Sequence, residues 1–126
     1  MVEQSVDLLK KLPPFLAWMP QEGLEMFQNC FDLEVEAVPA GERRGSGGRL
    51  GILLSGELER LSGPLEPGAL WGAARREDGS LCREDVSVTA VRDSEIAWLD
   101  GAVLTAVCYR ACWFHGRFVL EAGRYL

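Results

Sequence analysis

The sequence lacks two features that would place the protein at a membrane or directly on DNA. No apolar run of about eighteen or more residues occurs, and a membrane-spanning helix needs a run of that order. The first residues also lack the basic flank, apolar run and cleavage site of a signal peptide. Thirteen lysine and arginine residues stand against nineteen aspartate and glutamate residues, a net charge of -6, so the chain by itself has no basic surplus to bind a phosphate backbone. We expect a cytoplasmic protein with no membrane partner.

Cysteine and histidine are scarce, which limits the chemistry open to the chain. Four cysteines, Cys30, Cys82, Cys108 and Cys112, are too few for a disulfide scaffold, and a reducing cytoplasm keeps them as thiols. The single histidine, His115, leaves no Ser-His-Asp or Cys-His pair to argue for. We therefore expect no catalytic residues and no enzymatic activity.

The rest of the composition is that of one folded domain. Hydrophobic residues make up 48% and charged residues 25% of the 126 residues, values typical of a folded chain with one hydrophobic core. Residue patterns divide the chain into helices at about 5–30, strands at about 31–99 and helices at about 100–126. The whole of residues 1–126 is predicted to form one domain.

Two short helices are predicted near the beginning of the chain. Apolar residues recur through Ser5–Leu12 until a pair of prolines ends that helix. Pro20 stands where a first helical turn tolerates proline, and Glu22 lies near the positive end of the same helix. The second helix is therefore predicted to run from Pro20 to Cys30.

The middle of the chain has the pattern of short strands with glycine at their corners. Leu33, Val35 and Ala37 alternate with acidic residues, which predicts a strand with one solvent-exposed face. Further strands are predicted at Leu50–Leu54, ended by Ser55 and Gly56, at Glu57–Leu61, at Val86–Ala90 and at Glu95–Leu99, the last two separated by Arg92–Ser94. This spacing predicts a mainly β fold with flanking helices, in which the strands form a sandwich or a barrel.

The C-terminal segment returns to helical spacing. Asp100 is suited to cap a helix whose apolar residues recur every three or four positions from Val103 to Ala111. A last helix follows Gly116 and reaches Leu126 without a cap or a breaker, so we expect the chain to be part of a longer protein.

Cys108, Cys112 and His115 lie near one face of the first of these C-terminal helices. Cys108 and His115 would be about 10 Å apart along the helix axis, so one metal ion could hardly bind all three residues. The favoured interpretation is two thiols buried against the roll and a histidine at the helix end. The alternative is a metal or haem site completed by a ligand from elsewhere, and no cofactor is assigned.

Four motifs follow one another along the predicted roll in a fixed order: Pro39-Ala40-Gly41, Leu50–Leu58, Leu65–Gly72 and Val88–Leu99. In this order and spacing they resemble the cyclic-nucleotide-binding domain of Crp/Fnr transcriptional regulators over nearly the whole chain. The resemblance implies a cupin-like double-stranded β-roll, or jelly roll, at about 31–99. It also implies an effector-sensing domain whose last helix pairs with a second copy. It also implies that a helix-turn-helix domain outside these residues makes the DNA contact.

The resemblance also marks a ligand site. In the family a Phe-Gly pair precedes a glutamate that contacts the ribose, and an arginine followed by Ser or Thr binds the cyclic phosphate. Trp71 and Gly72 match the first pair, but Ala73 replaces the glutamate, and Glu84 and Asp85 stand at the arginine and hydroxyl positions. Two carboxylates repel a phosphate, so we expect that cAMP does not bind through the usual contacts.

Three arginines near this motif complete the candidate ligand-binding set. Arg83 is one residue away from the family position, which turns a strand side chain to the other face. Arg75 and Arg76 are expected to lean in from a short helix. The ligand-binding candidates are Trp71, Gly72, Ala73, Arg75, Arg76, Arg83, Glu84 and Asp85.

An aromatic stripe near the C-terminus predicts a homodimer. Phe114, Phe118, Glu121 and Tyr125 are the expected dimer-interface residues, because three aromatic side chains at helical spacing favour a partner helix. Two other interpretations stay open. One is a ligand-free protein-interaction module of the same fold, and the other is a cupin-like metalloenzyme, which usually needs several histidines on strands.

Overall fold

The computed structural model describes residues 21–78, 80–104 and 117–122. Helix α2 (Gln21–Phe31) precedes the strands β1 (Glu34–Val38), β2 (Arg43–Gly45), β3 (Arg49–Arg60), β4 (Gly63–Leu65), β5 (Leu70–Trp71), β6 (Ala73–Arg75), β7 (Leu81–Arg83) and β8 (Ser87–Asp100). The 3-10 helix η2 (Gly101–Leu104) and the helical residues 117–122 follow. The mainly β fold with flanking helices is therefore confirmed, whereas the helix predicted at Ser5–Leu12 lies outside the described residues.

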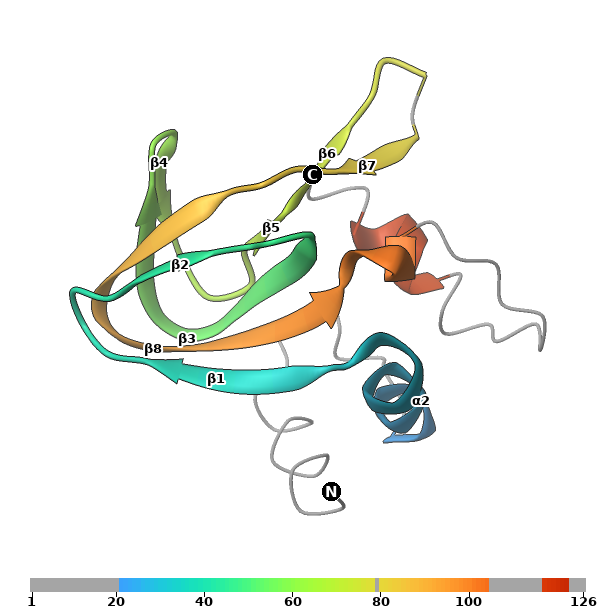
Figure 1. Cartoon of the computed structure of the whole chain (residues 1–126), viewed down its shortest axis with the longest axis horizontal. Coiled ribbons are helices and arrows are strands. Elements are labelled where there is room, and N and C mark those ends of the chain that lie inside the picture. Colours follow the sequence, from blue (N-terminus) through green and yellow to red (C-terminus); the bar gives the residue numbers. More distant parts are fainter. Residues whose placement is uncertain (1–20, 79, 105–116, 123–126) are drawn as a thin grey trace.

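The strands form an antiparallel roll built on its two longest members. In the main sheet the order is β1-β8-β3-β4, with β2 paired to β8 and β5 paired to β3. Strands β6 and β7 form a separate two-stranded hairpin that extends away from the roll (Figure 1). Each long strand therefore carries several short partners along its length, which closes the sheet on itself.

Strands β3 and β8 are continuous, which corrects two predicted breaks. The sequence pattern predicts interruptions at Ser55–Gly56 and at Arg92–Ser94, and in the structure both segments lie inside a strand. The β3–β8 pairing shifts register three times between Leu53 and Leu58. Such bulges bend a strand and increase its twist without ending it. The predicted breaks are therefore the bends of the roll.

Gly56 and Ser94 form the main bend together. Gly56 has a φ of 95°, and a Cβ at this position would collide with the Ser94 hydroxyl. The Ser94 side chain is buried, accepts a hydrogen bond from the Glu57 N–H at 3.1 Å and donates to the Arg92 carbonyl at 2.8 Å. A glycine and a buried hydroxyl from two distant segments therefore satisfy the polar groups that the bulge releases from the ladder.

The two faces of β3 and β8 pack into two different hydrophobic clusters. Ile52 and Leu54 of β3 face the cluster that we call the helix-side cluster, whereas Leu53 between them faces the roll interior. On β8, Ala97 and Trp98 divide in the same way. The helix-side cluster comprises Phe27, Phe31, Leu33, Leu50, Ile52, Leu54, Leu70, Ala97, Leu99, Val103, Leu104, Phe118 and Ala122; the roll-interior cluster comprises Val38, Leu53, Leu58, Leu65, Trp71, Val88, Ala90, Ile96 and Trp98. Because both faces are covered, Leu50–Leu54 is an unbroken apolar run.

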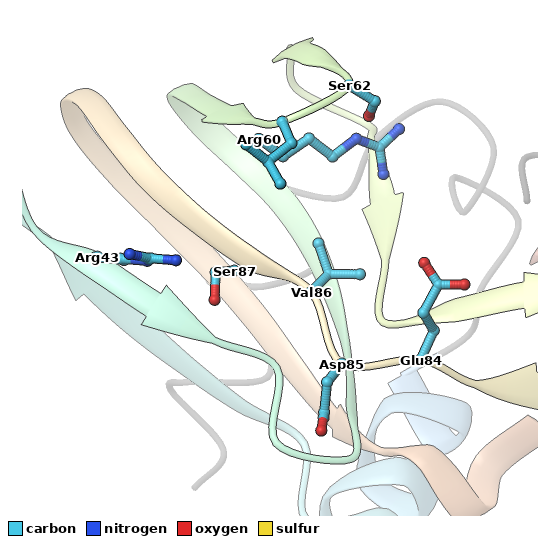
Figure 2. Close-up of a pocket in the computed structure, with 8 residues that line it drawn as sticks. Arg43, Arg60, Ser62, Glu84, Asp85, Val86 and Ser87 are labelled. Carbon is cyan, nitrogen blue, oxygen red and sulfur yellow. The ribbon is translucent and has the colours of Figure 1, made fainter.

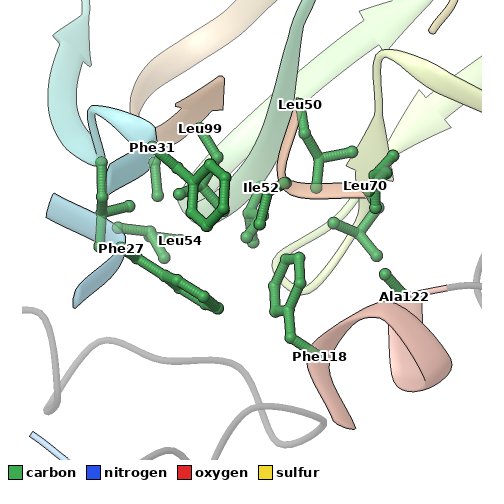
Figure 3. Close-up of a cluster of buried hydrophobic side chains, with 13 residues drawn as sticks. Phe27, Phe31, Leu50, Ile52, Leu54, Leu70, Leu99, Phe118 and Ala122 are labelled. Carbon is green, nitrogen blue, oxygen red and sulfur yellow. The ribbon is translucent and has the colours of Figure 1, made fainter. Parts of the chain in front are cut away.

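Aromatic contacts connect the two flanking helical segments to each other. Phe27 of α2 makes edge-to-face contacts with Phe31 at 6.0 Å and with Phe118 at 5.0 Å between ring centroids (Figure 3). Asp100 accepts a hydrogen bond from the Ala102 N–H at 2.9 Å, as expected of a helix cap, although the described element that follows is a single 3-10 turn. In the described ranges, no helix is long and apolar enough to cross a bilayer.

Candidate functional site

A polar pocket of about 440 Å³ lies between strand β2, the β3–β4 turn and the segment that joins β7 to β8. Figure 2 shows that the labelled residues of this pocket come from three separate parts of the chain. Its lining residues are Arg43, Arg60, Leu61, Ser62, Glu84, Asp85, Val86 and Ser87. The volume lies within the range of about 300–1000 Å³ that is usual for small-molecule sites.

Glu84 and Asp85 are the two predicted ligand-site residues that line this pocket. Their expected place on a strand is wrong, because β7 ends at Arg83 and β8 begins at Ser87. Outside a strand, adjacent side chains need not point to opposite faces, so both carboxylate residues border the same space. Both residues line the pocket, although their carboxylates are directed to opposite sides of the segment (Figure 2).

A buried serine holds the acidic segment in place. The Ser46 side chain is completely buried; its hydroxyl accepts a hydrogen bond from the Val86 N–H at 2.9 Å and donates to the Glu84 carbonyl at 3.2 Å. The Ser46 N–H also donates to the Val86 carbonyl at 2.9 Å. Three hydrogen bonds from one residue therefore fix the backbone on both sides of Asp85.

Gly72 supports the same segment from the other side. Its carbonyl accepts a hydrogen bond from the Glu84 N–H at 3.0 Å, which joins the Trp71-Gly72 pair to the acidic segment. Gly72 has a φ of 98°, and a Cβ here would collide with the Arg49 carbonyl. Trp71 is 1% exposed and packs edge-to-face on Trp98 at 5.6 Å. These two residues build the roll and do not line the pocket.

The other ligand-site candidates also lie outside the pocket lining. Ala73 and Arg75 belong to strand β6, and Arg76 follows it in the hairpin, which corrects the expected short helix. The hairpin replaces a helix because β6 pairs with β7 at three positions, from Ala73 with Arg83 to Arg75 with Leu81. Arg83 is exposed, with its side chain beside the backbone of η2.

Arg43 and Arg60 were missed by the sequence analysis although both line the pocket. Arg43 is on β2, opposite Thr89 of β8, and Arg60 ends β3 before the turn at Leu61 and Ser62. Their sequence neighbourhoods show only strand and turn patterns. They come near the acidic segment through the folding of three distant stretches, and no local motif signals that approach.

Arg44, next to Arg43, is occupied in a separate ion-pair network. Its Nε donates to Glu36 at 2.9 Å, and its terminal nitrogen Nη1 lies 3.1 Å from a carboxylate oxygen of Glu42. Glu36 also accepts a hydrogen bond from the Trp98 Nε1 at 2.9 Å. The Arg44 hydrogen bond, with help from Trp98, holds the pKa of Glu36 below its usual value although partial burial acts in the opposite direction. This pairing explains why Glu36 is half-buried on the face that the alternation predicts to be exposed.

The pocket presents both charge signs to a ligand. Arg43 and Arg60 supply planar guanidinium donors, Glu84 and Asp85 supply carboxylate acceptors, and Ser62 and Ser87 add hydroxyls. Within the described part of the chain, no group of three His, Cys, Asp or Glu residues is placed to hold a metal ion. The pocket can therefore make charge-assisted hydrogen bonds of both polarities.

Phe118, an expected dimer-interface residue, is 0% exposed and lies against Phe27 in the helix-side cluster. This corrects the expectation for that side chain, because a residue buried in its own chain is not presented to a second copy. Glu121 lies on the same helical segment and is half-buried. The other interface candidates, Phe114 and Tyr125, and the thiol and imidazole candidates Cys108, Cys112 and His115 lie outside the described residues.

No family model and no curated protein matches this sequence, whereas solved structures match it closely in shape. A candidate cyclic nucleotide-binding protein from Geobacter metallireducens is similar with a TM-score of 0.65 at 17% identity, over 96% of this chain and 93% of that one. The N-terminal domain of a transcriptional regulator from Streptomyces coelicolor gives 0.55 at 14% identity, over 92% and 88%. The catabolite activator protein of Thermus thermophilus gives 0.52 at 21% identity, over 89% of this chain and 57% of that protein.

These likenesses define the class of the molecule through its fold. The chain has the antiparallel β-roll with flanking helices of cyclic-nucleotide-binding domains, as the order of its glycine-cornered motifs indicates. The similar structures include a transcriptional regulator domain and also the cyclic-nucleotide-binding homology domain of a KCNH channel, at a TM-score of 0.53 and 16% identity. The resemblance found in the sequence is thereby confirmed at the level of the fold.

Proposed function

We propose that this chain is the effector-sensing domain of a bacterial Crp/Fnr-type transcriptional regulator and that it is not an enzyme. The observation that carries the proposal is the roll with a polar pocket beside the Trp71-Gly72 motif, where the acidic segment is fixed by Ser46 and Gly72. The similar Streptomyces coelicolor regulator domain supports the regulatory assignment. In this proposal the intact cytoplasmic protein forms a homodimer through its C-terminal helix and contacts DNA through a separate module.

We further propose that the effector is not a cyclic nucleotide bound through the usual phosphate contacts. Glu84 and Asp85 occupy the positions where the resemblance places an arginine and a hydroxyl residue. A cyclic phosphate brought to this segment meets two carboxylates, and the bidentate guanidinium fork that recognises phosphate is absent from these positions.

Calorimetric titration with cAMP and cGMP tests this proposal. The natural chain should show no saturable binding, whereas the double variant Glu84→Arg with Asp85→Thr should gain affinity of about tenfold or more, because it places the fork and the hydroxyl on the fixed segment. The variant Glu77→Arg makes the same exchange of a carboxylate for a guanidinium on the β6–β7 hairpin and should gain nothing. Binding of cAMP to the natural chain, lost in a Gly72→Ala variant that remains folded, would contradict the proposal.

A further inference from the structure

Several charged side chains of the described residues form no ion pair, and four of them line the pocket. Elsewhere in the described residues, Arg44, Arg49 and Arg92 each lie within 3.6 Å of a carboxylate oxygen. Within the same described residues, the pocket's two arginines and two acidic residues form no ion pair, neither with one another nor with a neighbour; they are Arg43, Arg60, Glu84 and Asp85. Four charges thus border one cavity without neutralising each other.

The two charge signs belong to different walls of the pocket. Arg43 projects from β2 and Arg60 from the end of β3, whereas Glu84 and Asp85 lie on the segment before β8 (Figure 2). The Ser46 hydrogen bonds hold the backbone of the acidic segment. This anchoring fixes the backbone that carries the two carboxylates. The Glu84 carboxylate is directed toward the side of the pocket where Arg60 lies, whereas the Asp85 carboxylate is directed the opposite way (Figure 2).

The chemistry of these walls selects among ligand classes. An anion that the guanidinium groups attract is repelled by Glu84 and Asp85. A cation is attracted by these carboxylates and repelled by the guanidinium groups. A molecule that carries both charges is favoured by both walls, since guanidinium binds a carboxylate in a fork and carboxylates accept from an ammonium group. Leu61 and Val86 add apolar lining between the charged groups.

We infer that this pocket binds a small zwitterion, an aliphatic molecule with an amino group at one end and a carboxylate at the other. The amino group lies toward Glu84 and Asp85, the carboxylate toward Arg43 and Arg60, and the methylene chain against Leu61 and Val86. The inference deepens the proposed function and rests on it, because it names the chemical class of the effector.

Amide NMR titration of the full chain with a homologous series tests the inference. The probes are the ω-amino acids from glycine to aminohexanoate, with butylamine and butyrate as controls that each carry one charge. One chain length should bind about tenfold more tightly than either control, because both walls contribute only when both charges are present. The shifted amides should be those of residues 60–62 and 84–87.

Matched variants identify the two walls separately. The double variant Glu84→Gln with Asp85→Asn and the single variant Arg60→Gln should each weaken binding about tenfold. The controls Glu77→Gln and Arg76→Gln, on the β6–β7 hairpin outside the pocket, should leave binding unchanged.

Three outcomes would overturn the inference. Butyrate could bind as tightly as the best zwitterion, with neither affinity changed by Glu84→Gln with Asp85→Asn. That result would make the ligand a simple anion and would leave the proposed regulatory function standing. No binding of any probe up to about 10 mM would also reject the zwitterion, because a specific effector binds at lower concentrations than this. Saturable binding of cAMP to the natural chain would reject the proposal that the effector is not a cyclic nucleotide, and the zwitterion with it, and would leave the regulatory assignment standing.

Discussion

At the scale of single residues, Ser46 connects the polar pocket to the body of the roll. Its hydroxyl serves one N–H and one carbonyl of the segment that carries Glu84 and Asp85. Buried backbone groups without a partner are destabilising, so this serine is a requirement for the local backbone path as well as for the position of the carboxylates.

Ser46→Ala is expected to lower the free energy of unfolding by about 1–3 kcal/mol, since it leaves the Val86 N–H and the Glu84 carbonyl without the hydroxyl. Urea unfolding measures the loss, and faster amide hydrogen exchange at Val86 localises it. Ser80→Ala removes an exposed hydroxyl bonded to Asp78 and should change stability by less than about 0.5 kcal/mol. Equal stability of the two variants would contradict the role given to Ser46.

At the scale of secondary structure, Phe118 attaches the helical residues 117–122 to helix α2. Its ring lies 5.0 Å from that of Phe27, and Ala122 of the same turn is also buried. The contact surface of this helix is thus directed at its own chain. Exposed residues of the helix, such as Leu120 at 61% exposure, remain for other contacts.

Phe118→Ala should destabilise the chain by about 3–5 kcal/mol, because a fully buried aromatic ring leaves a cavity. Leu120→Ala, two residues away and exposed, should change stability by less than about 0.5 kcal/mol. Thermal unfolding at several protein concentrations measures both, and Phe118→Leu provides a milder loss if the alanine variant does not fold. A Phe118 effect that appears only as a dependence on protein concentration would mean that the ring packs against a second copy.

The local patterns predict some of these elements and miss others for physical reasons. Helix α2 and the turn at Gly41 follow from residues close in sequence, and the structure confirms both. The continuity of β3 does not follow from neighbouring residues, because the bulge at Gly56 depends on Ser94. The Ser94 hydroxyl accepts a hydrogen bond from the Glu57 N–H, 37 positions away in the sequence. A glycine in a strand pattern signals a break or a bulge equally well until its distant partner is known.

The pocket shows the same division between local and distant information. Gly72 of the Leu65–Gly72 motif accepts a hydrogen bond from the Glu84 N–H, a contact that counting along the sequence does not predict. Arg60 belongs to the pocket only because the β3–β4 turn returns over the acidic segment. Sequence motifs identify residues that keep fixed spacing, whereas residues brought in by sheet closure need the three-dimensional structure.

At the scale of the whole molecule, the net charge of -6 bears on self-association. Two copies repel each other at low ionic strength, and salt at about 0.15 M screens that repulsion beyond about 8 Å. A homodimer of this domain therefore needs a close apolar contact rather than long-range attraction, and the aromatic C-terminal residues are the proposed source of it.

Sedimentation equilibrium at about 0.15 M salt should show a reversible dimer of the chain. Tyr125→Ala should weaken that dimer about tenfold or more, the size of effect expected of an aromatic interface residue. Leu61→Ala removes a fully exposed leucine at the β3–β4 turn and should leave the dimer unchanged. A monomer at every concentration would contradict the predicted interface.

The sheet formed by β3 and β8 is the single layer that separates the pocket side of the molecule from its helix side. Val86, in the pocket, packs against the roll-interior cluster, and Phe118 belongs to the helix-side cluster. The two clusters are separated by one layer of backbone, on which Ile52 and Leu53 are neighbours facing opposite ways. Densely packed interiors have little spare volume, so a displacement of Val86 is transmitted to the side chains that it contacts. Only this one sheet separates those side chains from the ones that pack against the helices.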